Sequence, residues 1–237
     1  MYARKQILPD NSYSHVFFRC HNRQFFLKHN HVKNFLILLW AKYKKKYGIE
    51  IYEFIIMDNH AHLLLRAHST EQLGNFMRTV NSQLARYINR TFDRDSQAVR
   101  ERYKSPLITG TKYAHRVMQY IWLNRHKVNK SKNPFNDPYC SASWRINSRM
   151  ELCISNKEKN YTLLRNLLDS DDYIYPIEKI SKFVRDLING AMGRNDKFSD
   201  SIMMHGHTIG GANVLRRRTE LLNKFKMRNS AHPPILH

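Results

Sequence analysis

The sequence has little of three things, and each shortage excludes a class of protein. Its 237 residues include only three cysteines, Cys20, Cys140 and Cys153, which are scattered along the chain. They form no disulfide framework and no pair at zinc-finger spacing, so we expect a protein of the reduced cytoplasm. No apolar run approaches the roughly 18 residues that a membrane-spanning helix needs, and the first residues lack the apolar core of a signal peptide. Internal repeats and low-complexity segments are also absent.

Acidic residues are scarce as well. The chain has 40 Lys and Arg against 19 Asp and Glu, which gives a formal net charge of +21. Hydrophobic residues make up 42% of the chain, which excludes a disordered polycation. So large an excess of positive charge favours an anionic partner. Nucleic acid is the commonest such partner, and an anionic membrane surface is the main alternative.

The pattern of apolar residues predicts strands and helices in the order β-α-β-β-α-β. This is the order of a ferredoxin-like sandwich, an α+β fold in which one antiparallel sheet packs against two helices. A further helix over residues 111–125 is expected near the other face or the edge of the sheet. The sandwich consists of strands predicted over residues 14–20, 49–57, 60–66 and 102–108 and of helices over residues 30–47 and 70–88.

The composition changes after residue 130. Residues 133–144 are typical of a loop, with Pro134 and Pro138 as breakers. We therefore expect one domain over residues 1–144 and a basic, mainly helical C-terminal extension over residues 145–237. The extension could bind DNA or cover the sheet, and the sequence does not decide between these roles.

His60 and His62 are two residues apart on a predicted strand. Both imidazoles should project from the same face, roughly 6–7 Å apart, which is suitable for binding one metal ion. Because the chain has 13 histidines, a pair without function is the alternative. His205 and His207 have the same spacing, but they lie in a glycine-rich stretch where no strand orients them, and we assign them no role.

Tyr120 and Asn124 are four residues apart on the predicted third helix, so they share one face. An amide oxygen is a suitable ligand for Mg²⁺ or Mn²⁺, and a tyrosine one turn away could attack an anion that the metal binds. Packing within an amphipathic helix is the alternative role for Tyr120. Tyr113 and Tyr103 are the other candidate nucleophiles.

Four segments together resemble a known family. Residues 57–65, Met-Asp-Asn-His-Ala-His-Leu-Leu-Leu, resemble the His-x-His signature of single-tyrosine HUH transposases. Residues 15–23, 102–105 and 120–124 resemble the first strand, the Arg-Tyr-Lys strand and the Tyr-Ile-x-Leu-Asn helix of the REP-associated tyrosine transposases. The chain departs from this family at Arg125, where the family usually has proline.

The resemblance implies a metal-dependent transposase that cleaves and rejoins single-stranded DNA at hairpins or palindromes. It implies that Tyr120 is the nucleophile and forms a 5′-phosphotyrosine, and that His60, His62 and Asn124 bind Mg²⁺ or Mn²⁺. A bacterial, cytoplasmic and nucleoid-associated protein is expected, acting as a monomer or a homodimer and without a membrane. A non-catalytic module that binds hairpin DNA or RNA is the alternative.

Basic and aromatic side chains are the candidates for DNA contacts. Lysines and arginines would hold phosphates, and aromatic rings such as Phe17 and Phe18 would stack on unpaired bases. The residues expected to contact DNA are Arg19, Arg23, Arg102, Lys104, Arg216, Arg217 and Arg218.

Overall fold

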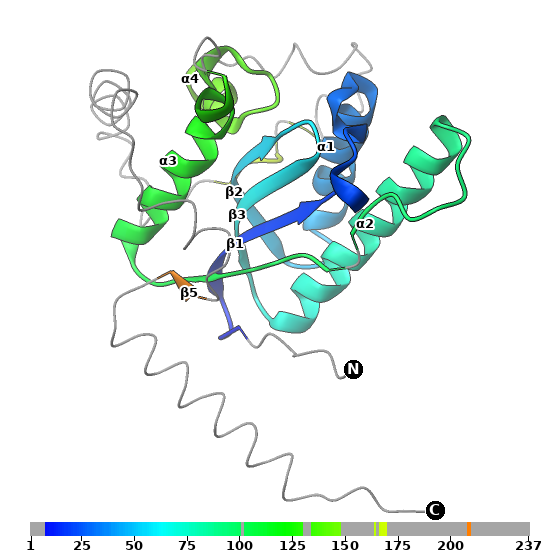
Figure 1. Cartoon of the computed structure of the whole chain (residues 1–237). Coiled ribbons are helices and arrows are strands. Elements are labelled where there is room, and N and C mark those ends of the chain that lie inside the picture. The colour runs from blue at the N-terminus through cyan, green and yellow to red at the C-terminus, as the bar shows by residue number, and fades with distance from the viewer. Residues whose placement is uncertain are drawn as a thin grey trace, which may run out of the picture.

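A computed structural model describes residues 8–100, 102–129, 134–147, 164, 166–169 and 208–209. The elements follow in the predicted order, with short additions (Figure 1). They are β1 (Ser12–Arg19), the 3₁₀ turns η1 (His21–Arg23) and η2 (Phe26–Lys28), α1 (Asn30–Lys44), β2 (Ile49–Ile56), β3 (His60–Ala67), α2 (Thr70–Thr91), β4 (Leu107–Ile108), α3 (Thr111–Val128), η3 (Pro134–Asn136), α4 (Ser141–Asn147) and β5 (Thr208–Ile209).

The sheet has the strand order β2-β3-β1-β4-β5. The first four strands pair antiparallel, and β5 pairs parallel with β4. The order β2-β3-β1-β4 confirms the expected ferredoxin-like α+β sandwich. In the pairing of β1 with β3, Phe17 lies opposite His62 and Arg19 lies opposite His60. The histidine pair is therefore on a strand that is bonded on both sides.

Helices cover both faces of the sheet (Figure 1). Alternate residues of β3, such as Leu63 and Leu65, pack into the core under α1 and α2. Leu64 belongs instead to the second core, which contains the apolar residues of α3. Since side chains alternate along a strand, His60 and His62 point to the same side as Leu64, toward α3. The third helix thus lies on the face of the sheet to which both histidines point.

Local sequence explains where two of the helices begin and end. Ser69 caps α2, because its hydroxyl accepts a hydrogen bond from the Gln72 amide at 3.2 Å. Gly48, which follows α1, has φ +59°, a conformation that favours glycine. A Cβ at this position would lie 2.7 Å from the His68 ring. Within the described residues, no helix is both long enough and apolar enough to cross a membrane.

Two predictions from the sequence differ from the structure. The fourth strand is shorter than expected, because Lys104 joins β1 only through an isolated bridge to Phe17. Residues 141–144, expected in a loop, begin helix α4. Helix α4 is fixed by tertiary contacts that the local sequence does not show: Trp144 is buried in the core, and the Ser141 hydroxyl donates a hydrogen bond to Glu53 on β2.

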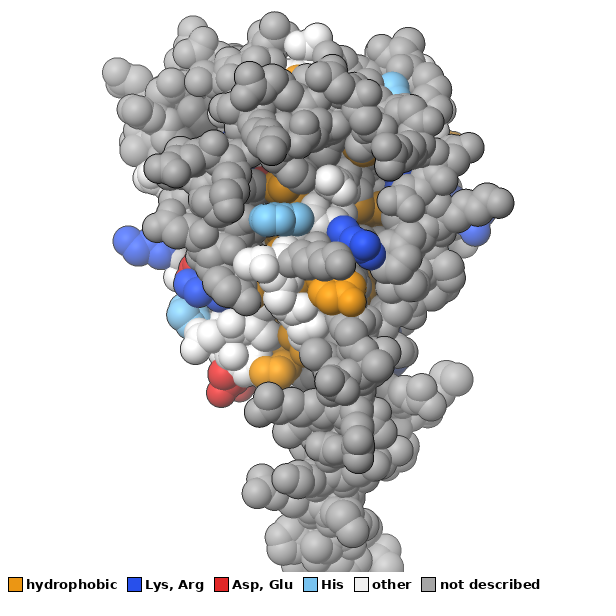
Figure 2. Space-filling model, turned by 90° about the vertical axis from the view of Figure 1, so that its left-hand side faces the viewer, with side chains coloured by type: hydrophobic (Ala, Val, Ile, Leu, Met, Phe, Trp, Pro, Cys, Tyr) orange, Lys and Arg blue, Asp and Glu red, His pale blue; other side chains and the backbone are white. Residues whose placement is uncertain are grey.

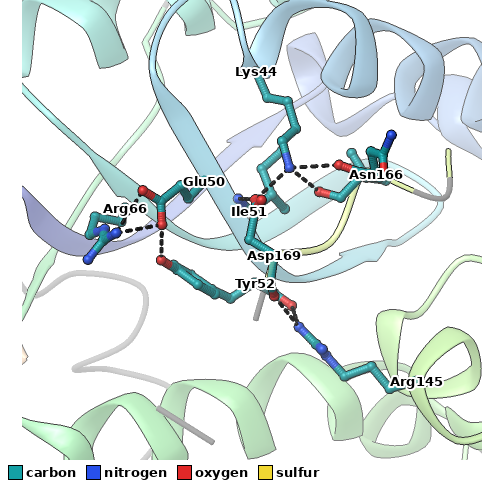
Figure 3. Close-up of polar contacts among 9 residues, drawn as sticks. Lys44, Glu50, Ile51, Tyr52, Arg66, Arg145, Asn166 and Asp169 are labelled. Carbon is teal, nitrogen blue, oxygen red and sulfur yellow. Dashed lines mark hydrogen bonds and ion pairs between the residues drawn. The ribbon is translucent and has the colours of Figure 1, made fainter. Parts of the chain in front are cut away.

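A segment from the C-terminal region lies along β2 (Figure 3). Leu168 forms a parallel bridge with Ile51, and the Asp169 carboxylate accepts hydrogen bonds from the Ile51 amide at 2.7 Å and the Lys44 ammonium at 2.5 Å. Arg145 Nη2 donates to the Asp169 carbonyl oxygen at 3.0 Å. Within the predicted helix over residues 161–168, Leu168 is instead part of the bridge to β2. Most of residues 145–237 lie outside the described residues, so the boundary at residue 144 stays a prediction.

Candidate active site

Two imidazoles on β3 form the centre of the site. His62 is wholly buried, and its Nδ1 lies 2.9 Å from Nε2 of His15 on β1. His60 Nδ1 lies 2.7 Å from the Asn59 side-chain oxygen. Because an amide oxygen only accepts, this bond leaves the lone pair of His60 on Nε2. Among the described residues, the buried Nε2 of His62 has no hydrogen-bond partner.

Both imidazoles are held in the neutral form. Burial, together with the positive charges of Arg19 and Arg125, lowers the pKa of His60 to about 4. Complete burial, together with the neighbouring histidines, holds the pKa of His62 well below its usual range. Neutral imidazole is the form that binds a divalent metal ion.

Helix α3 brings Tyr120 to these histidines and carries Asn124 one turn further along. The Tyr120 ring lies edge-on to the His62 ring, with ring centroids 5.4 Å apart, and edge-on to the His15 ring at 5.6 Å. Tyr120 and Asn124 are 6% and 7% exposed. The Lys127 ammonium lies 4.9 Å from the centroid of the Tyr120 ring. Tyr120 therefore contacts the histidine pair from a separate element, and Asn124 is buried one turn further along the same helix.

The alternative tyrosines occupy other places. Tyr103 packs against the core under α1 and α2, on the opposite face of the sheet, with its hydroxyl close to Gly74. Tyr113 is on the first turn of α3, two helical turns before Tyr120, and packs against the second core. In the described part of the chain, no ring contact joins either tyrosine to His60 or His62. The position of Tyr120 is therefore the best suited to chemistry at the histidines.

The donor atoms fit a small divalent cation. Two neutral imidazoles are suitable ligands, and the buried Nε2 of His62 has no hydrogen-bond partner among the described residues. The Asn124 amide could add an oxygen ligand. No group of three or more His, Cys, Asp or Glu side chains that could hold a metal exists among the described residues. A third protein ligand would therefore have to be of another type, such as an amide. The assignment of His60, His62 and Asn124 as metal ligands stays a prediction.

His15 is a site residue that the sequence analysis missed. Its imidazole is wholly buried and stacks on the His62 ring, with centroids 5.1 Å apart and an interplanar angle of 19°. The signal was present in the sequence, because alternation along the first strand places His15, Phe17 and Arg19 on one face. What the sequence could not supply is the pairing register that sets this face beside His62.

Arg125, where the resembling family usually has proline, anchors the helix. Its guanidinium forms an ion pair with Asp137 at 2.5 Å, lies 3.4 Å from the Asp58 carboxylate and donates to the Ile56 carbonyl oxygen at 2.7 Å. Asp58 belongs to the turn that precedes His60. Arg125 therefore links the C-terminal half of α3 to the turn that presents the histidines.

Four of the expected DNA contacts can be located. Arg19 is half-buried beside Tyr120, and Arg23, Arg102 and Lys104 are exposed. Their roles in DNA binding stay predictions. The remaining three expected contacts lie outside the described residues, namely Arg216, Arg217 and Arg218.

The expectation that Phe17 and Phe18 stack on bases is wrong. Phe17 is 7% exposed and lies beside the His62 ring, while Phe18 is 2% exposed in the core under α1 and α2. Neither ring offers a face to an incoming base, because both are needed for packing.

On the side of the molecule that carries α3, described histidine, basic and hydrophobic side chains lie next to one another at the surface (Figure 2).

The fold and the site define a class of protein. The chain is similar to a solved REP-associated tyrosine transposase bound to a REP hairpin, with a TM-score of 0.52 and 17% sequence identity. The match covers 66% of this chain and 93% of that chain, and it shows that the two share a fold. No protein of curated function matches the sequence.

The sequence of the same region is similar to a known family. Residues 10–124 match the family model of IS200-like transposases. The matched region begins just before β1, includes His60 and His62 and ends at Asn124 on α3. Residues 10–124 are thus similar to the IS200-like transposases, which supports a general role as a DNA-binding transposase.

Proposed function

We propose that the protein is a metal-dependent single-stranded DNA endonuclease and transesterase of the REP-associated type. The observation that carries this proposal is the packing of Tyr120 edge-on against His62, whose buried Nε2 has no hydrogen-bond partner among the described residues. A potential nucleophile and a potential metal ligand are thus in contact. Since one chain supplies both groups, a monomer suffices to form the site.

Each residue has a defined part in the proposed reaction. His60, His62 and Asn124 would hold a Mg²⁺ or Mn²⁺ ion, which when bound supplies positive charge to orient and polarise the scissile phosphate. Tyr120 Oη attacks phosphorus and forms the Tyr–O–P bond as the bond from phosphorus to the 3′ oxygen breaks. Tyr120 loses its phenolic proton and the departing 3′ oxygen gains one, which leaves a 5′-phosphotyrosine and a free 3′-hydroxyl.

The covalent product explains how the same site could rejoin DNA. The phosphotyrosine keeps a phosphodiester linkage, so a second 3′-hydroxyl can attack it and release Tyr120. No nucleotide cofactor is needed for this exchange. A single-stranded DNA with a stem-loop or palindrome is the proposed substrate, since the similar solved protein is bound to a REP hairpin.

The first prediction concerns Tyr120. With Mn²⁺ or Mg²⁺ and a labelled single-stranded DNA that carries a palindrome from the flanks of its own gene, the protein should form a covalent adduct. Tyr120→Phe should abolish this adduct, because phenylalanine lacks the attacking oxygen. Denaturing gel electrophoresis of the labelled DNA measures the outcome.

Tyr113→Phe is the matched control, since it removes a hydroxyl from the same helix two turns away. This variant should form the adduct as the unaltered protein does. An adduct that persists in Tyr120→Phe and disappears in Tyr113→Phe would show that the nucleophile has been misassigned.

One observation favours a second function, a non-catalytic module that binds hairpin DNA. Tyr120 is only 6% exposed, whereas a nucleophile must reach a phosphate. This alternative predicts tight, metal-independent hairpin binding that His60→Ala with His62→Ala leaves unchanged, and no adduct from the unaltered protein. The proposed enzyme predicts an adduct that is lost in this double variant and in the presence of EDTA.

A further inference from the structure

The loop after β1 exposes an aromatic ring. Phe25 lies between η1 and η2, and 60% of it is exposed to solvent. Among the described residues, Val128 is the only other exposed large hydrophobic residue. A ring of this size in water costs solvation free energy, and large aromatic side chains in contact with solvent often mark binding surfaces.

Three arginines gather beside this loop. The isolated antiparallel bridge between Cys20 and Val99 sets Arg100 beside Arg19, and the positive charges of Arg23 and Arg100, after burial, lower the pKa of Arg19. The Arg100 amide also donates a hydrogen bond to the Arg19 carbonyl oxygen at 2.9 Å. Within the described part of the chain, none of the three forms an ion pair. Such a cluster of cations without a carboxylate is suited to an external anion.

The loop is attached directly to the candidate active site. The Asn59 side chain donates a hydrogen bond to the Arg23 carbonyl oxygen at 3.1 Å, and the same side chain accepts one from His60. The Cys20 amide donates to the Asn59 carbonyl oxygen at 2.8 Å. Phe25 follows Arg23 by two residues, so their Cα atoms are at most about 7.6 Å apart. The loop that carries Phe25 and Arg23 is therefore bonded to the turn that presents His60.

We propose that Phe25 stacks on an unpaired base of the single-stranded DNA, while Arg19, Arg23 and Arg100 bind the phosphates next to that base. This inference rests on the proposed function and names a subsite for its substrate. Every base has an apolar face that an aromatic ring can stack on, and guanidinium groups bind phosphate oxygens in a bidentate manner. The part of the DNA that binds this subsite is therefore the unpaired strand that leads to the scissile phosphate. The bases of the paired stem are stacked on one another and do not bind there.

Binding without chemistry tests this subsite. In the full chain carrying Tyr120→Phe, with EDTA present, fluorescence anisotropy is measured with a labelled stem-loop that has an unpaired flank and with a blunt stem-loop. Phe25→Ala should weaken binding of the flanked stem-loop about ten-fold, which is typical of the loss of one base–aromatic stack, and leave binding of the blunt one unchanged. Phe25→Trp should restore the affinity.

Val128→Ala is the matched control, because it removes the other exposed hydrophobic side chain from the described surface. It should bind both probes as the unaltered chain does. An unchanged affinity of Phe25→Ala for the flanked probe, or an equal loss on both probes, would overturn the inference. These results are separate from the proposed function, which fails only if the unaltered protein forms no Tyr120 adduct.

Discussion

Asn59 and His15 determine how the two candidate metal ligands are presented. Each contacts Nδ1 of one imidazole, Asn59 at His60 and His15 at His62. In metal sites the second ring nitrogen of a histidine usually has such a partner, which fixes the ring and the tautomer. The Asn59 oxygen leaves the lone pair of His60 on Nε2, and Nε2 of His62 is available to a ligand when His62 Nδ1 donates its proton to His15. At the scale of single residues, Asn59 and His15 thus hold the two imidazole rings in the way that neighbouring residues hold histidines in metal sites.

A prediction about His15 follows from this arrangement. His15→Ala should weaken Mn²⁺ binding by about 10- to 100-fold, the usual effect of removing a residue that orients a ligand. Isothermal titration calorimetry on the chain without DNA measures this affinity directly, independent of DNA cleavage.

His68→Ala is the corresponding control, since His68 is exposed, directly follows β3 at the end opposite His60, and is hydrogen-bonded to Asn11. This variant should bind Mn²⁺ as the unaltered protein does. Equal affinities for His15→Ala and the unaltered protein would show that His15 serves only in packing.

At the scale of elements, a buried carboxylate joins β2 to the helices beside it. Glu53 is wholly buried and accepts hydrogen bonds from Trp122 Nε1 on α3 and from Arg145 Nε on α4, both at 2.6 Å. The Ser141 hydroxyl on α4 also donates to it. Trp122 lies between Tyr120 and Asn124 in the sequence, so Glu53 helps to fix the helix that carries both.

Loss of Glu53 should therefore destabilise the protein strongly. Glu53→Ala leaves the largely buried Arg145 guanidinium, whose side chain is 16% exposed, without its carboxylate, and breaking such a pair costs about 3–5 kcal/mol of unfolding free energy. Urea unfolding followed by circular dichroism gives this quantity.

Glu50→Ala, three residues away on the same strand, provides the comparison. Glu50 pairs with Arg66, with side chains 28% and 32% exposed, and accepts a hydrogen bond from the Tyr52 hydroxyl. Loss of this partly exposed pair and one hydrogen bond should cost about 1–2 kcal/mol, less than the loss of Glu53. Similar losses in the two variants would contradict a special role for the buried network.

At the scale of the whole molecule, the net charge of +21 predicts DNA binding that weakens steeply with salt. The structure allows part of this salt dependence to be assigned to the arginines beside Phe25. Arg23→Ala with Arg100→Ala should reduce the slope of log K against log salt by about 1.4 for single-stranded DNA, at about 0.7 per phosphate contact.

Lys45→Ala with Lys46→Ala changes the net charge equally but acts at the exposed C-terminal end of α1. This pair should alter the slope less than the arginine pair does. Equal changes in the two double variants would show that the charge acts diffusely and that the arginines beside Phe25 have no privileged contact with phosphates. Anisotropy titrations at several salt concentrations provide the slopes.

Much of the fold could be predicted because its elements have strong local patterns. The helix from Asn30 and the strands that carry Ile51 and His62 have clear apolar periodicity, and Ser69 is a standard helix cap. Helix α4 could not be predicted, since it depends on contacts of Ser141 and Trp144 with residues far away in the sequence. The pairing of the segment around Asp169 with β2 could not be predicted either, because it too joins residues that are far apart in the sequence.

The sequence alone determined the chemistry that the site can offer: a histidine pair two residues apart, a tyrosine and an amide one turn apart, and a large excess of positive charge. Only the tertiary structure decided which of these groups meet. It brought Tyr120 to His62, placed Tyr103 on the other face, buried Phe17 and left Phe25 exposed. The reason is that exposure and contact depend on the register of strands and the packing of helices, which join residues that no local pattern connects.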